Sequence, residues 1–221
     1  MTNVLTLDGK GAALALVFGV AILFFGRNLG VFFLFEMLLF LMLAALVTRA
    51  GIYKKKRLGV YEATRGWKNV VANGLTPLAV SFVYFINYSA GFLPRETVAI
   101  VYVASVAAVA ADKFASEIGI LDGDPVMLMS LRRVKKGTSG GVNALGIAAA
   151  FAAAVVIGSG VYLIGGSFVS IAVVAVSGLA GDIVDSVLGY WEEKKIGNKH
   201  TSNFACSVVG AAACVVILAL L

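Results

Sequence analysis

Charge is scarce in this sequence. Asp, Glu, Lys and Arg make up 14% of its 221 residues, while 60% are hydrophobic and the mean hydropathy is +0.96. Soluble domains carry roughly a quarter charged residues. The composition therefore excludes an ordinary soluble domain and predicts an integral membrane protein. The sequence also lacks the roughly ten-residue alternating segments of membrane barrels, so the spans should be α-helices.

Cysteine and histidine are rare as well, with two cysteines and one histidine in the chain. Cys206 and Cys214 lie on one predicted helix, about 12 Å apart along its axis, which is too far for a disulfide between them. We interpret both as small core residues. Without clustered His or Cys, a metal site should use oxygen ligands, which suits Mg²⁺ better than zinc.

The common nucleotide-binding loops are missing too. Neither Gly-x4-Gly-Lys-Ser/Thr nor Gly-x-Gly-x-x-Gly occurs in the sequence. What is present is a series of long apolar runs, each able to cross a bilayer. They predict a single all-α transmembrane domain, residues 1–221, with seven helices: Gly11 to Gly26, Leu29 to Thr48, Leu75 to Leu93, Thr97 to Ile118, Val142 to Ile164, Gly166 to Leu188 and Asn203 to Leu221.

Basic residues are distributed unevenly between the two sides of this arrangement. All but two of the 18 fall on the side with the N-terminus, and only Arg27 and Arg95 fall on the other. Positively charged loops stay in the cytoplasm, so the N-terminus should face it, across the cell membrane if the source is prokaryotic. The net charge of +6 then reflects topology and not nucleic-acid binding. We interpret "KKKR" (Lys54 to Arg57) as a lipid-headgroup anchor.

An internal repeat marks the second half of the chain. "ADKFASEIG" (Ala111 to Gly119) and "GDIVDSVLG" (Gly181 to Gly189) share the pattern Asp-x3-Ser-x2-Gly. On a helix this spacing places Asp112 with Ser116, and Asp182 with Ser186, on one stripe, with Asp185 adjoining. Because both helices run toward the cytoplasm, we expect parallel repeat units over residues 97–164 and 166–221.

A third and weaker copy would begin the chain. Its helix carries Glu36 in mid-membrane, for which the sequence offers no partner. The segment "RGWKNVVANG" follows, with Asn69 and Asn73 four residues apart on one helix face.

Carboxylates inside membrane segments require an explanation, because each costs several kcal/mol unless it meets water, a partner or a cation. Asp112, Glu117, Asp182 and Asp185 all lie near predicted cytoplasmic helix ends. A single such residue would be a hydrated or paired helix-end charge. Two matching stripes favour a site instead, and these four residues are the candidate Mg²⁺ ligands.

The segment "KKGTSGG" lies just ahead of a predicted helix. Its two lysines, hydroxyl groups and free backbone amides are typical of a phosphate site. The alternative is that Thr138 or Ser139 caps the helix and the lysines follow the positive-inside rule. Lys199 and His200 lie in another basic loop and are further candidates, although a solvated loop histidine is an equally simple interpretation.

Four segments, "RGWKNVVANG", "ADKFASEIG", "KKGTSGG" and "GDIVDSVLG", resemble in that order the signature segments of an integral-membrane family that includes plant phytyl-phosphate kinase and an uncharacterised animal transmembrane relative. The resemblance covers most of the chain from Arg65 onward. The pieces Asp-x-x-Ala-Ser-x-x-Gly and Lys-Lys-Gly-Thr are also similar to the nucleotide-binding parts of dolichol and phytol kinases and of membrane cytidylyltransferases, which use CTP.

The resemblance implies transfer of a phosphoryl group from CTP to an isoprenoid monophosphate at the cytoplasmic membrane face, with Mg²⁺. One departure is that "GTSGG" lacks the glutamate of the dolichol-kinase pattern. A cytidylyltransferase that makes a CDP-lipid and a transporter remain alternatives, and the prenyl chain length, the choice of nucleotide and the oligomeric state stay open.

These considerations assign candidate roles. Asp112, Asp182 and Asp185 are the candidate catalytic and metal-binding residues, with Glu117 as a fourth metal ligand. Arg65, Asn69 and Asn73 are candidates for the acceptor phosphate. The remaining candidates for nucleotide binding are Ser116, Lys135, Lys136, Gly137, Thr138, Ser139, Gly140, Gly141, Asn143, Ser186, Lys199, His200 and Asn203.

Overall fold

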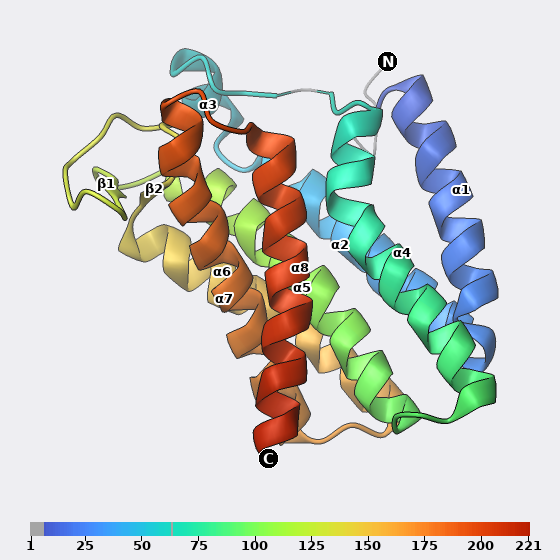
Figure 1. Cartoon of the computed structure of the whole chain (residues 1–221). Helices are drawn as coiled ribbons and strands as arrows, with labels where there is room; N and C mark the ends of the chain where they lie inside the picture. Colours follow the sequence, from blue (N-terminus) through green and yellow to red (C-terminus); the bar gives the residue numbers. More distant parts are fainter. Residues whose placement is uncertain (1–6, 63) are drawn as a thin grey trace.

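The computed structural model describes residues 7–62 and 64–221 and is a bundle of α-helices (Figure 1). The helices are α1 (Gly9–Phe25), α2 (Gly30–Arg49), α3 (Ile52–Arg57), α4 (Trp67–Ala90), α5 (Arg95–Gly119), α6 (Ala144–Gly158), α7 (Phe168–Glu193) and α8 (Lys199–Leu220). Two 3₁₀ segments, η1 (Arg27–Leu29) and η2 (Ser159–Ile164), and two short strands, β1 (Val126–Met127) and β2 (Gly141–Val142), complete it. The all-α membrane fold is confirmed.

Six of these helices are long and apolar enough to cross a bilayer, counting the described residues only. They are α2 to α8 without the short α3, and α2 and α6 are extended by their adjoining 3₁₀ turns. α1 is a shorter apolar helix of 17 residues. The chain is therefore an integral, multi-pass membrane protein.

The connections divide between two ends of the bundle. Figure 1 shows the start of α1, α3, the β1–β2 pair and the α7–α8 connection at one end, and the C-terminus with the α4–α5 connection at the other. We call the first the basic end. Arg27 and Arg95 lie together at the opposite end, each with its guanidinium over the ring of Tyr88, at 5.3 and 3.9 Å.

α5 forms the centre of the bundle. All residues from Val98 to Asp112 are buried, and α2, α4, α6, α7 and α8 contact this helix. Small residues allow the close approach. A Cβ at Gly178 of α7 would lie 3.2 Å from the carbonyl carbon of Ala107, and one at Gly210 of α8 would lie 3.1 Å from the carbonyl oxygen of Ala104. Backbones in such contact gain packing energy that apolar side chains alone do not gain in lipid.

α4 begins earlier than predicted. It starts at Trp67, not at Leu75, and it contains Pro77 in its interior. The apolar run that predicts a membrane span begins only at Leu75, although Asn69 and Asn73 were already expected on one helix face. Asn69 and Asn73 face the inside of the bundle, where they line a cavity, so polarity there does not conflict with a membrane helix.

Other predicted boundaries also move. α7 extends to Glu193 and α8 already begins at Lys199, because Asn198 caps it through hydrogen bonds to the amides of His200 and Thr201. The predicted helix over residues 142–164 is a shorter α6 followed by the 3₁₀ segment η2. The antiparallel pairing of β1 with β2 was not predicted.

The two helices that carry the Asp-x3-Ser stripes, α5 and α7, contact each other and both run toward the basic end, while α6 and α8 run back (Figure 1). This arrangement brings the two stripes to the same level of the bundle.

Candidate active site

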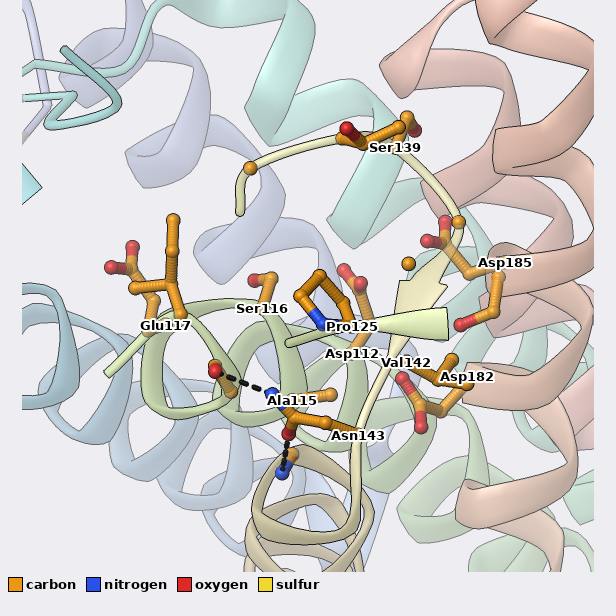
Figure 2. Close-up of a pocket in the computed structure, with 18 of the residues that line it drawn as sticks. Asp112, Ala115, Ser116, Glu117, Pro125, Ser139, Val142, Asn143, Asp182 and Asp185 are labelled. Atoms are coloured by element: carbon orange, nitrogen blue, oxygen red, sulfur yellow. Dashed lines mark hydrogen bonds between the residues drawn. The ribbon is translucent and has the colours of Figure 1, made fainter. Parts of the chain in front are cut away.

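A cavity of about 280 Å³ lies at the basic end, beside the last turns of α5. Both stripes contribute to its wall, with Asp112 and Ser116 from α5 and Asp182, Asp185 and Ser186 from α7. The loop of residues 136–143 forms another wall. Figure 2 shows the three aspartates around one space, with Ser139 on the loop beyond them. Residues some seventy positions apart in the sequence thus share one site.

Asp112 and Asp182 are buried, Asp185 is half-buried, and none of the three aspartates forms a close ion pair among the residues described. Asp112 is 9% exposed and Asp182 is 5% exposed. In the described ranges, none of the three carboxylates has a Lys, Arg or His nitrogen within 4.0 Å. The carboxyl groups of Asp112 and Asp185 lie close enough to interact with each other. Two acidic groups at this distance are stable only if a proton or a cation lies between them.

Two carboxyl groups of this cluster have oxygen atoms that are free to accept a ligand. The Oδ1 atom of Asp185 is buried without a hydrogen-bond partner among the residues described. Asp182 likewise makes no hydrogen bond within that part of the chain, although it is buried and faces the cavity. Such atoms are costly to bury unless something binds them. The donor set consists only of hard oxygens, which fits Mg²⁺.

The residues described do not by themselves provide a full set of metal ligands. Within the described part of the chain, no three His, Cys, Asp or Glu side chains are grouped so that they could hold an ion by themselves. Mg²⁺ is commonly held by one or two carboxylates together with water and substrate phosphates. The aspartates therefore fit a metal that arrives with a phosphate ligand.

Glu117 lines the same cavity, but its carboxylate already has several partners. Its Oε2 lies 2.6 Å from Lys55 Nζ, and its Oε1 pairs with Lys113 and lies 3.5 Å from Arg65 Nη2. The hydroxyl of Thr48 also donates to Oε1 at 3.1 Å. A carboxylate with three cations is a poor candidate for a metal ligand, so the expectation for Glu117 changes to a positioning role.

The position of Lys55 differs from the expectation for the segment that contains it. We interpreted the Lys54 to Arg57 segment as a headgroup anchor, but the side chain of Lys55 is 1% exposed. Besides its ion pair with Glu117, its ammonium group donates to the carbonyl oxygens of Val47 and Thr48 at the end of α2. Cations stabilise helix C-termini in this way. The burial of Lys55 depends on its contact with Glu117 of α5, and no local sequence pattern predicts this contact.

The loop of residues 137–141 is fixed to the end of α7. Ser139 donates through its amide to Glu193 and through its hydroxyl to Glu192, at 3.0 and 2.7 Å. Gly140 has a positive φ of +75°, and a Cβ there would lie 2.8 Å from the amide nitrogen of Tyr190. A Cβ on Gly189, the last residue of the second stripe, would lie 2.6 Å from the Cα of Gly140. Both glycines are therefore required for close contact.

Hydrogen bonding within the loop limits its use as a phosphate cradle. The amides of Thr138 and Gly141 donate to the carbonyl oxygens of Lys135 and Thr138, and the amide of Ser139 is taken by Glu193. Fewer backbone donors remain for a phosphate than the sequence pattern suggested. Lysine side chains of the cavity wall are then the main groups available to phosphate oxygens.

Four lysines line the cavity: Lys55, Lys113, Lys136 and Lys199. Lys199 is 56% exposed, pairs with Glu62 at 3.6 Å and interacts electrostatically with Asp112. Lys135 is exposed and lies outside the cavity wall, as does His200. The structure thus brings Lys136 and Lys199 to the site and leaves Lys135 and His200 beside it. The sequence did not single out Lys55, Lys113, Glu62 or Glu192 as cavity residues.

Asn143 and Asn203 both line the cavity but are engaged in the protein. Asn143 caps α6 by accepting from the amide of Gly146 at 2.8 Å, so the cap is not Thr138 or Ser139. Its amide group also donates to the carbonyl oxygen of Gly119 at 2.7 Å (Figure 2). The same group donates to the carbonyl oxygen of Asp122 at 2.8 Å. Asn143 thereby connects the end of α5 to the start of α6.

Arg65, Asn69 and Asn73 line a second cavity, between α1, α2 and α4. Burial lowers the pKa of the Arg65 guanidinium, and the carboxylates of Glu117, Glu62 and Asp112 raise it. An arginine stays protonated at neutral pH despite such a shift. The residues expected to bind an acceptor phosphate are therefore together, but they lie behind the wall of the first cavity.

Comparison with known proteins agrees with this architecture. Residues 2–217 match the family described as "Integral membrane protein DUF92". The chain is 32% identical over 206 residues to "Uncharacterized membrane protein MJ0933" of Methanocaldococcus jannaschii, covering 92% of this chain and 82% of that protein. It is 29% identical over 178 residues to "Protein PGR" of Arabidopsis thaliana, covering 69% of this chain and 62% of that protein. No solved structure matches the chain. This chain belongs to the DUF92 family of integral membrane proteins.

Proposed function

We propose that this protein transfers a phosphoryl group from a nucleoside triphosphate, with CTP favoured, to a prenyl monophosphate, and that Mg²⁺ accompanies the nucleotide. The observation that carries the proposal is the group of three aspartates, Asp112, Asp182 and Asp185, which come from two helices and face one cavity, with no cationic nitrogen within 4.0 Å among the residues described. A site of buried carboxylates beside lysines is suited to a metal-bound polyphosphate.

The charge arrangement supports a phosphoryl-transfer site. The aspartates form one side of the cavity wall, and Lys113, Lys136 and Lys199 add positive charge to the same wall. When bound, Mg²⁺ would neutralise the charge of the donor phosphates and polarise the transferred group. Carboxylates and lysines in one cavity wall allow the site to hold both the metal and the phosphate oxygens.

The reaction requires little acid–base chemistry from the protein. An oxygen of the acceptor phosphate forms a bond to the γ-phosphorus while the bond from that phosphorus to the β–γ bridging oxygen breaks, which leaves a nucleoside diphosphate and a prenyl diphosphate. A phosphate monoester with a second pKa near 6 is largely ionised at neutral pH. The residues of the chain then have to position the two substrates and balance charge, which matches a cavity wall without histidine among the residues described.

The choice of CTP rests on similarity of sequence motifs. Asp112, Ala115, Ser116 and Gly119, together with Lys135 to Thr138, form the pattern that is similar to CTP-dependent lipid kinases and cytidylyltransferases. The excess of basic residues at the basic end further supports a cytoplasmic site, where nucleotide is available.

The test compares turnover of detergent-purified wild type and Asp182→Asn with Mg²⁺, CTP and a prenyl monophosphate, with products identified by mass. We expect the wild type to form prenyl diphosphate and CDP, and the variant to be slower by about a hundredfold or more, because a metal contact contributes several kcal/mol to the transition state.

A matched control is Asp124→Asn, since Asp124 is 68% exposed, lies at the same end and does not line the cavity. It should retain wild-type turnover. Near-normal turnover of Asp182→Asn would refute the metal role, and formation of CDP-lipid with pyrophosphate would instead support a cytidylyltransferase. Absence of product with any nucleotide would favour transport.

A further inference from the structure

A second cavity of about 70 Å³ lies where α1 packs against α2 and α4. Its wall is apolar along most of its length, and its largest side chains are Phe18 of α1 and Phe40 of α2. The other apolar lining residues are Leu7, Ala15, Ile22, Leu34, Met37, Leu38, Leu41, Ala44 and Val70. Gly74 keeps this space open, because a Cβ there would lie 2.9 Å from the ring of Phe18.

One end of this cavity is polar and charged. Arg65, Asn69 and Asn73 line it, and Arg65 is 8% exposed. The contacts of the Arg65 side chain involve only Nη2, which donates to the hydroxyl of Thr48 at 2.6 Å and lies 3.5 Å from Glu117. Nε and Nη1 make no hydrogen bond to the residues described. A guanidinium with free donors in a fork geometry is suited to a phosphate.

The polar end adjoins the first cavity. Arg65 pairs with Glu117, and Asn73 accepts a hydrogen bond from Asn203 at 3.1 Å. Glu117 and Asn203 line the first cavity, so these two pairs form the wall between the cavities. Arg65 is also close enough to Asp112 to interact with it electrostatically. A phosphate held by Arg65 would therefore lie next to the aspartates.

We propose that the second cavity binds the first part of the hydrocarbon chain of the prenyl monophosphate, with the phosphate at Arg65 facing the first cavity. This assignment rests on the proposed function and adds the location and the form of the acceptor. The apolar wall matches a hydrocarbon chain, and the buried guanidinium matches its anionic end.

The size of the cavity limits how many hydrocarbon chains of a lipid it can hold. Sites that enclose a drug-sized ligand have volumes of about 300 Å³ or more, so about 70 Å³ holds only part of one chain. Two acyl chains side by side do not fit, and the rest of a long chain must continue into the bilayer. The cavity therefore takes a single-chain phosphate and sets little limit on total chain length.

The test uses a farnesyl-length monophosphate that carries a photoreactive diazirine in its second isoprene unit. It is irradiated with the full-length protein in detergent without nucleotide, and labelled peptides are identified by mass spectrometry. We expect labels on the cavity faces of α1, α2 and α4. Geranylgeranyl monophosphate should compete with the probe, whereas the two-chain lipid phosphatidate should not.

A pair of variants on α1 sharpens the test. Ala15→Leu adds volume inside the cavity and should lower labelling about tenfold, which corresponds to about 1.4 kcal/mol of lost binding. Ala13→Leu changes an exposed residue of the same helix that does not line the cavity, and its labelling should equal that of the wild type.

Each other outcome contradicts a stated part of the account. Labels on other helices, or no specific labels, overturn the cavity assignment even if the protein turns over. Equal competition by phosphatidate overturns the assignment of a single-chain lipid. Labels in the cavity without any turnover would support the cavity assignment and contradict the proposed reaction, so the two failures are distinguishable.

Discussion

The buried ion cluster around Glu117 gives a quantitative prediction about stability. Glu117→Gln keeps the shape of the side chain but removes the one anion that pairs with Lys55, Lys113 and Arg65. The side chains of Lys55 and Arg65 are 1% and 9% exposed, so water cannot replace the lost partner. Leaving buried charge without its partner costs about 3–5 kcal/mol.

Lys55→Met removes one of the cations of the same cluster instead of its anion. Glu117 keeps two cations in this variant, so no buried charge loses its last partner. The carbonyl oxygens of Val47 and Thr48 lose a donor each, and one such hydrogen bond contributes about 1 kcal/mol. We therefore expect a loss of about 2 kcal/mol, smaller than for Glu117→Gln.

The assay is thermal unfolding in detergent, followed with a thiol-reactive fluorophore. Cys206 and Cys214 are both 0% exposed and free, so their reactivity reports unfolding. For a chain of this size 1 kcal/mol corresponds to about 2–4 °C in Tm, so Glu117→Gln should lower the Tm by roughly 6–20 °C. Lys56→Met, at an exposed neighbour, should change it little. A Tm of Glu117→Gln equal to that of Lys56→Met would refute the reasoning.

Three further predictions concern single contacts. Gly189→Ala should raise the KM for nucleotide several-fold in the turnover assay while the protein stays folded, because its Cβ would push Gly140 and the loop away from α7. Glu36 is fully buried with both carboxylate oxygens unpartnered among the described residues, so it should be protonated; Glu36→Gln should leave the Tm unchanged, whereas a large loss would indicate a buried ion pair. Asn143→Ala should cost about 1–3 kcal/mol, seen as a lower Tm, since it removes a helix cap and two hydrogen bonds, and an unchanged Tm would contradict the capping role.

The helix stripes could be predicted from the sequence because they depend on local periodicity. Asp112 and Ser116 recur as Asp182 and Ser186 at the same spacing, and helical geometry then places each pair on one face. That the two faces meet follows from the parallel course of α5 and α7 (Figure 1). Charge distribution likewise predicted which loops share an end of the bundle.

The partners of Glu117 could not be predicted, because they come from other elements. Lys55 is one of four consecutive basic residues, and nothing local distinguishes this buried lysine from the less buried basic residues beside it. For the same reason Glu117 looked like a metal ligand until its three cations were placed around it. Asn69 and Asn73 were recognised as one face, but their polarity obscured the start of α4 because the cavity that they line is a tertiary feature.

The central claim is that the aspartate cavity transfers the γ-phosphoryl group of a nucleotide to a lipid phosphate. The most direct measurement incubates the purified protein with Mg²⁺, prenyl monophosphate and CTP that carries distinguishable phosphorus labels at the α and γ positions. If the γ-phosphoryl group is transferred, the γ label appears in the prenyl diphosphate and the α label remains in CDP. Appearance of the α label in the lipid, or no label in the lipid at all, would contradict it.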